Sequence, residues 1–178
     1  MQIPKALTPT AILLSSVTLL LGAGGCGSSR PTGAPSATPG VHIVTTTAIL
    51  ADWARQVAGE AAQVQSLLSP GGDPHTFNPS PGEMAALSEA DLILLNGLGM
   101  EHWAEALLAE AVAVQVVYLG EMVDPIPAED ERDLGVWDPH FWLDPSRVVM
   151  AVEAIRDALL LANPAGSETY RENAAAYI

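Results

Sequence analysis

Two histidines of the 178-residue chain follow the same Asp-Pro pair and are the residues best suited to chemistry. They are His75 and His140, which end the Asp-Pro-His triplets 73–75 and 138–140. Proline fixes its own φ angle and pushes the preceding residue towards an extended conformation, so each histidine should lie on a stiff loop. Neutral imidazole is the commonest metal ligand, and two stiff loops suit a preorganised site. We therefore expect His75 and His140 to bind one divalent metal ion.

A single histidine on a loop is more often polar surface than a ligand, so the repeated motif is what favours metal binding. We expect His42, at the start of an apolar run, to be structural or exposed, and His102 to face solvent. The aromatic pair after the second motif, Phe141 and Trp142, is expected to pack in the core. Asp144 precedes a proline and is expected to cap a helix rather than bind metal.

From residue 41 onward, short apolar runs alternate with segments of helical periodicity. This pattern predicts an α/β fold with a parallel sheet and helices on both faces. Ser80 and Glu83 have the spacing of a capping box, so the loop with His75 should connect a strand to a helix. Ligands bind outside the carboxyl ends of such strands. The expected strands span residues 41–46, 64–68, 91–95 and 114–119, and the expected helices begin near residues 49, 80, 101, 145 and 167.

The composition limits the class of protein. An apolar fraction of 49% is enough for a hydrophobic core. The formal net charge of −14 argues against nucleic acid as a partner, because phosphate contacts need a basic surface. The segment 120–136 is rich in carboxylates, and we interpret it as a solvated loop; transient capture of cations is the alternative.

Residues 1–25 have the pattern of an export signal, with Lys5, an apolar run over 11–21 and small residues before Cys26. A single cysteine at this place resembles the lipobox of bacterial lipoproteins, which implies that Cys26 carries a lipid that attaches the protein to the membrane. The alternative is an ordinary secretory signal. Cys26 is the only cysteine, which excludes an intramolecular disulfide and a cysteine-based zinc site. Residues 27–40 are rich in Gly, Ser, Thr and Pro and should form a flexible tether.

In their order along the chain, these motifs resemble the metal-specific substrate-binding proteins of bacterial zinc and manganese ABC importers. The resemblance implies two α/β lobes joined by a long rigid helix, with the metal held between the lobes. It also implies that His75 and His140 are the ligands from the N-terminal lobe, and that an ABC permease is the partner. We expect that lobe to span residues 41–163, the connecting helix to start within 164–178, and the second lobe to be missing. The similar motifs are Pro74-His75, residues 88–92, Asn96-Gly97, Glu101, Trp103, residues 138–140 and residues 142–145.

The expected function is capture of a divalent transition metal in the extracytoplasmic cell envelope, with zinc favoured over manganese. Zinc prefers four ligands, so two histidines would fill half of a tetrahedral site. We do not expect an enzyme, because neither histidine belongs to a His-Glu-x-x-His helix that would supply a general base. A zinc hydrolase is therefore the weaker alternative, and a metal-stabilised adhesion lipoprotein is the other.

Overall fold

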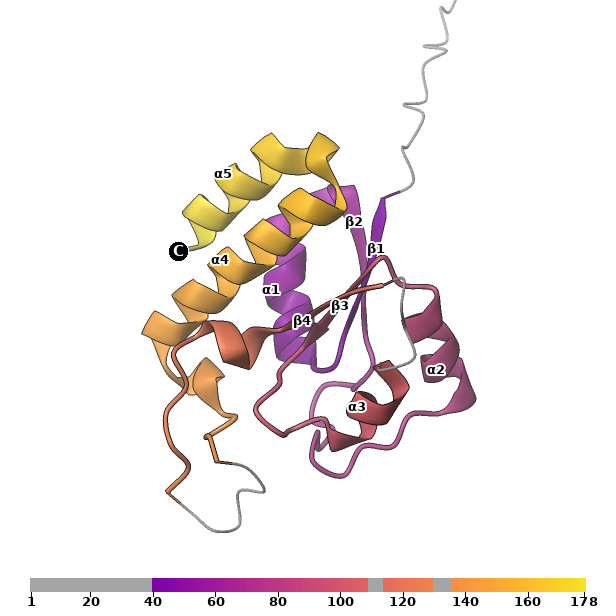
Figure 1. Ribbon diagram of the computed structural model, residues 1–178. Helices are drawn as coiled ribbons and strands as arrows, with labels where there is room; N and C mark the ends of the chain where they lie inside the picture. Colours follow the sequence, from indigo (N-terminus) through magenta and orange to yellow (C-terminus); the bar gives the residue numbers. More distant parts are fainter. Residues whose placement is uncertain (1–39, 109–113, 130–135) are drawn as a thin grey trace, which may run out of the picture. The chain divides into compact units, whose positions relative to one another are not determined.

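The computed structural model describes residues 40–108, 114–129 and 136–178, in which strands and helices alternate (Figure 1). The expected signal segment, Cys26 and the tether up to residue 39 lie outside the described residues. None of the helices in these ranges is long and apolar enough to cross a bilayer.

Four strands form one sheet with the spatial order β2-β1-β3-β4, and all three neighbouring pairs are parallel. Ile43 in the central β1 is paired with Val64 on one side and Leu92 on the other. The prediction of a parallel sheet is therefore confirmed. The strands are β1 (Val41–Thr45), β2 (Ala62–Ser66), β3 (Leu92–Leu95) and β4 (Gln115–Tyr118).

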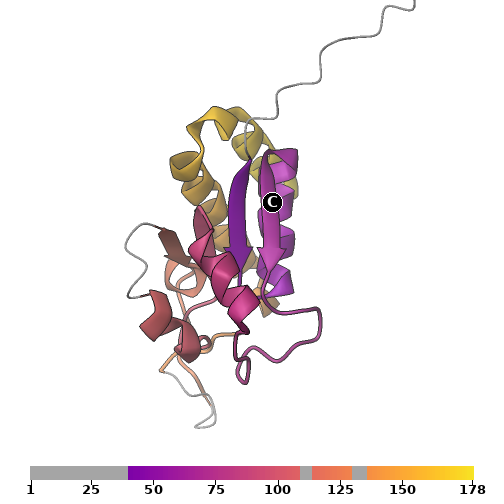
Figure 2. The same cartoon turned by 90° about the vertical axis from the view of Figure 1, so that its right-hand side faces the viewer.

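Helices cover both faces of this sheet (Figures 1 and 2). Three helices, α1, α4 and α5, share one hydrophobic core with the sheet, and α2 and α3 share a second core on the other face. This two-sided cover is the predicted arrangement. The helices are α1 (Ala48–Ala58), α2 (Pro81–Ser88), α3 (His102–Leu108), α4 (Pro145–Ala162) and α5 (Ser167–Tyr177).

Successive residues of the strands alternate between the two cores, which explains why the strands read as nearly continuous apolar runs. In β1, Ile43 belongs to the core under α1, α4 and α5, whereas Val44 belongs to the core under α2 and α3. Both are fully buried, as expected for a sheet that is covered on both faces. Tyr170 and Ala174 of α5 join the first core, and α5 packs against α1 and α4.

The helix starts follow the sequence signals. Ser80 accepts a hydrogen bond from the backbone N–H of Glu83, and the Glu83 carboxylate accepts one from the backbone N–H of Ser80, so the predicted capping box is present. Asp144 caps α4 by accepting the N–H of Ser146 at 2.8 Å, as expected. The two loops that carry His75 and His140 therefore each lead into a helix.

The second strand ends earlier than the alternation of Val64, Ser66 and Leu68 predicts. It spans Ala62–Ser66, and Leu67 and Leu68 are both buried in the core under α2 and α3. The reason is that the chain turns there: the N–H groups of Leu67 and Leu68 donate to Thr45 O and Thr46 O beyond the regular ladder.

A buried carboxylate joins the carboxyl ends of β1 and β3. Glu101 is only 4% exposed, and it accepts hydrogen bonds from the Thr46 hydroxyl at 2.6 Å and from the backbone N–H groups of Asn96 and Gly97 at 2.8 Å. Burial raises the pKa of Glu101, and the three hydrogen bonds counteract part of that rise. Glu101 therefore holds together the segments that follow β1 and β3. These segments lie at the carboxyl edge of the sheet, where His75 and His140 also lie.

Replacing Glu101 with glutamine should lower the free energy of unfolding by about 1–3 kcal/mol, because the amide nitrogen cannot accept the buried N–H of Gly97. The raised pKa also gives a pH dependence. The stabilisation that Glu101 contributes is fully present below its unfolded pKa and is lost as pH rises through its folded pKa. The penalty of Glu101→Gln, measured by urea unfolding from about pH 4 to about pH 8, should therefore shrink as pH rises.

Glu83 provides the control, because the Ser80 N–H lowers its pKa and the sign is opposite. Its stabilisation is present above the unfolded pKa and is lost as pH falls through the folded pKa, so the effect of Glu83→Gln should grow with pH. Equal and pH-independent effects of the two substitutions would contradict this account of Glu101.

Candidate metal-binding site

The loop that carries His75 follows β2 and is held by side chains at its two ends. Asp73 accepts the backbone N–H of His75 at 2.9 Å and the hydroxyl of Thr76 at 3.1 Å, which closes a tight turn. Phe77 packs edge-on against Trp103 of α3, with ring centroids 5.2 Å apart. Both rings contact the core under α2 and α3, so the loop is attached to the domain just after His75, whose side chain is exposed.

The loop that carries His140 lies at the same edge of the sheet and is attached more firmly. Pro139 is buried, and its carbonyl oxygen accepts a hydrogen bond of 3.0 Å from the side chain of Asn96 at the end of β3. Phe141 is 2% exposed and lies in the core beside Trp53 of α1. The loop is thus anchored on both sides of His140.

These anchors bring the two imidazoles together. The ring centroids of His75 and His140 are 5.7 Å apart, with 50° between the ring planes. Two imidazoles that share one tetrahedral zinc have ring centres about 5 Å apart, because each nitrogen lies about 2.0–2.1 Å from the metal. The separation is therefore close to the one that a shared ion requires.

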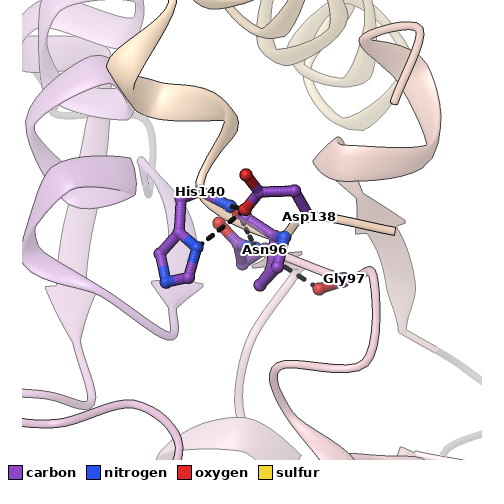
Figure 3. Close-up of polar contacts among 5 residues, drawn as sticks. Asn96, Gly97, Asp138 and His140 are labelled. Carbon is purple, nitrogen blue, oxygen red and sulfur yellow. Dashed lines mark hydrogen bonds and ion pairs between the residues drawn. The ribbon is translucent and has the colours of Figure 1, made fainter. Parts of the chain in front are cut away.

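Asp138 determines which nitrogen of His140 is available. Its Oδ1 lies 2.7 Å from Nδ1 of the His140 ring and accepts the His140 backbone N–H at 2.9 Å (Figure 3). That backbone hydrogen bond, together with the ring contact, lowers the pKa of Asp138. An ionised carboxylate only accepts hydrogen bonds, so Nδ1 carries the hydrogen, and in the neutral imidazole Nε2 keeps its lone pair free. Such a carboxylate also orients the ring and increases its basicity as a ligand.

Other candidate residues do not join the pair. Across the described residues, the structure contains no cluster of three or more His, Cys, Asp or Glu side chains suited to holding a metal. His42 lies at the amino end of β1, where its Nδ1 is 3.3 Å from Glu89 O, and His102 is exposed. Both fit the structural or exposed roles expected of them. Residues 130–135 of the acidic segment, like Cys26, lie outside the described residues.

The sequence assigned no anchoring role to Asn96 or Phe77, which hold the two loops. Asn96-Gly97 was one of the motifs of the family resemblance, without a structural role beyond ending a strand, and Phe77 was not interpreted at all. Phe77 stands two residues after His75, which is a weak signal of an anchor. Phe141, by contrast, was expected in the core, and it is buried there.

Known proteins with similar sequences bind metals. The family model described as zinc-uptake complex component A, periplasmic (ZnuA), matches residues 43–178. The manganese-binding lipoprotein MntA of Halalkalibacterium halodurans is 39% identical over 156 residues, which are 88% of this chain and 51% of MntA. The zinc-binding lipoprotein AdcA of Streptococcus pneumoniae is 35% identical over 150 residues, 78% of this chain and 30% of AdcA. The chain thus spans about half the length of such relatives, or less.

Solved structures show the same fold. Zn(II)-bound AdcA from Streptococcus pneumoniae matches with a TM-score of 0.70 and 34% identity, over 78% of this chain and 30% of AdcA. The periplasmic zinc-binding protein TroA from Treponema pallidum matches with a TM-score of 0.71 and 27% identity, over 78% of this chain and 50% of TroA. The parallel sheet with helices on both faces is therefore that of these metal-binding proteins. Through the match over residues 43–178, this chain belongs to the ZnuA family of metal-binding components of uptake systems.

Proposed function

We propose that this protein captures a divalent transition metal outside the cytoplasm and delivers it to the permease of an ABC importer. The observation that carries the proposal is the meeting of His75 and His140 at one edge of the sheet, with ring centroids 5.7 Å apart. Relatives named as manganese ABC transporter substrate-binding lipoproteins support delivery to such a permease. In this proposal, the two histidines are the ligands that the described lobe contributes.

Zinc is the proposed cargo, and manganese is the alternative. Two imidazole nitrogens favour zinc, whereas a set of oxygen ligands favours manganese. The names of relatives include manganese-, iron- and zinc-binding proteins, so family membership alone does not choose between them. The coordination positions that two histidines leave empty must be filled by other groups, and those groups decide the final preference.

The proposed location is the extracytoplasmic face of the cell envelope, where a lipid on Cys26 would anchor the protein. Several relatives are named lipoproteins, which supports this assignment. We further propose that residues 41–163 form an N-terminal metal-binding lobe and that α5 begins a connecting helix. A hydrolase is not favoured, because Asp138, the carboxylate in contact with His140, already accepts two hydrogen bonds from that residue.

Replacing either ligand should remove most metal binding. We expect His75→Ala and His140→Ala each to lose most of the zinc that the wild-type protein retains in equilibrium dialysis, because one imidazole alone holds a metal weakly. His42→Ala is the matched control, since His42 lies at the opposite end of β1, and it should bind zinc like the wild type. Unchanged binding in both site variants would refute the assignment.

The two aspartates of the repeated motif, Asp73 and Asp138, should differ in how much each contributes to metal affinity. Asp138 contacts both the ring and the backbone of His140, whereas Asp73 accepts the backbone N–H of His75 and the Thr76 hydroxyl. Losing a carboxylate that orients a ligating histidine typically costs about 10–100-fold in metal affinity. We expect Asp138→Ala to show a loss in this range in a chelator competition assay, and Asp73→Ala to show a smaller one. The reverse order would contradict the proposed role of Asp138.

Zinc-loaded protein should resist exchange with manganese. Nitrogen ligands bind Zn²⁺ more tightly than Mn²⁺, so an excess of about 100-fold manganese should leave most of the zinc bound. The measurement is the metal content by mass spectrometry after dialysis. Displacement of zinc by manganese would favour the manganese alternative.

A further inference from the structure

The side chain of Asn96 lies where three loops meet. Asn96 is fully buried at the end of β3, and its Nδ2 donates to Pro139 O at 3.0 Å and to Gly97 O at 3.3 Å (Figure 3). Its own backbone is held on both sides, because its N–H donates to Glu101 Oε1 at 2.8 Å and its carbonyl accepts from Gly120 N at 2.7 Å. Asn96 therefore connects the loop after β3, the loop after β4 and the loop that carries His140.

We propose that Asn96 is a positioning residue for His140, whose buried amide holds the Pro139 carbonyl and so sets where the His140 imidazole lies relative to His75. This inference rests on the proposed function of the histidine pair as metal ligands. It assigns to Asn96 a contribution to metal affinity, although its side chain does not touch the metal.

The peptide unit between Pro139 and His140 is held at both of its ends. The Pro139 carbonyl and the His140 N–H belong to the same planar group, so two hydrogen bonds at its ends fix its orientation. The carbonyl is bound by Asn96, and the N–H is bound by Asp138 Oδ1 at 2.9 Å. The same carboxylate oxygen holds the ring at Nδ1. Without the amide, the carbonyl end of this peptide unit would lose its partner. The ring would then be held by Asp138, by packing, and by the turn in which the Leu143 N–H donates to His140 O.

The environment of Asn96 shows that its donor is the group that matters. Its Oδ1 is buried and has no hydrogen-bond partner within the described part of the chain. A buried unpaired oxygen is unfavourable, and an apolar side chain of similar size would avoid that cost. The unpaired Oδ1 therefore lowers stability, whereas Nδ2 forms the hydrogen bond that holds the Pro139 carbonyl.

Binding should be sensitive to this contact, because ligand distances in metal sites vary by only about 0.2 Å. The His75–His140 separation of 5.7 Å is already close to a shared-ion geometry, so little rearrangement is required on binding. If the peptide unit before His140 is free to rotate, the ring must be ordered when the metal binds, and affinity falls.

The test compares three variants of the full chain. Asn96→Ala removes the side chain, and Asn96→Asp keeps its size but replaces the donor with an acceptor. Asn173→Ala is the matched control, because Asn173 Nδ2 also donates to a distant backbone carbonyl, Val57 O at 3.1 Å, at the far end of α1. Each variant is assayed for zinc affinity by chelator competition and for thermal stability.

Metal-free protein gives an independent readout of position. In the wild type, the His140 ring lies 5.7 Å from the ring of His75 and packs edge-on against Trp142 at 5.2 Å between centroids. Nuclear Overhauser contacts from the His140 ring to these two rings, and the ring-current shift caused by Trp142, should therefore be observable. They report the placement of the imidazole without any bound metal.

We expect both Asn96 variants to weaken these contacts and to lose about tenfold in zinc affinity, as for other residues that orient a ligand. Asn173→Ala should retain both the contacts of the His140 ring and the zinc affinity, even if its melting temperature falls. The inference would be overturned if Asn96→Ala kept the contacts and the zinc affinity of the wild type. It would also be overturned if Asn96→Asp kept both while Asn96→Ala lost them, because the size of the side chain rather than its donor would then be responsible. If the wild type fails to bind zinc while the contacts weaken in the Asn96 variants, the proposed function fails and the positioning role stands.

Discussion

The site depends on one constraint, which is that its two histidines lie on loops outside the strands of the sheet and outside the α-helices. A parallel sheet brings the carboxyl ends of its strands to one edge, so loops that are distant in the sequence meet there. Meeting is not sufficient for binding, because an unanchored loop would have to be ordered when the ion arrives. The fold meets this need with anchors: the buried Glu101 and Asn96, which hold the ends of β1 and β3, the buried Phe141 after His140, and the half-buried Phe77 near His75.

Two of these anchors, Glu101 and Asn96, are polar side chains whose burial costs free energy. Glu101 is a buried carboxylate whose pKa is raised by burial, and Asn96 has a buried oxygen without a partner in the described residues. Buried polar groups contribute less to stability than apolar packing of the same volume. They provide directional hydrogen bonds, however, and only directional bonds can fix backbone groups of irregular loops at a chosen position. The buried polar groups at this edge of the sheet therefore lower the stability of the domain but fix the positions of the loops.

A structural feature can be predicted from the sequence when the residues that determine it are close together along the chain. Strands, helices and caps were predicted well because each depends on nearby residues, as in the capping box of Ser80 and Glu83. The end of β2 was misplaced because its last residues follow the turn of the chain rather than a simple alternation. The contact between Asn96 and Pro139 joins residues 43 positions apart and leaves no local pattern, so the sequence could not predict it. The two histidines were found because a repeated triplet is visible without knowledge of the fold, and their role as ligands stays a prediction.

The two Asp-Pro-His triplets share a local sequence, yet the fold treats them differently. Each aspartate accepts the backbone N–H of its histidine at 2.9 Å, which is the local part of the motif. Only Asp138 also contacts the ring, and only its loop is fastened through a buried proline carbonyl, so His140 is half-buried whereas His75 is exposed. For a protein proposed to bind an ion and later release it, this asymmetry is useful. A fixed ligand would reduce the ordering cost of capture, and a ligand on a less constrained loop would add less to affinity, so that the ion would dissociate faster.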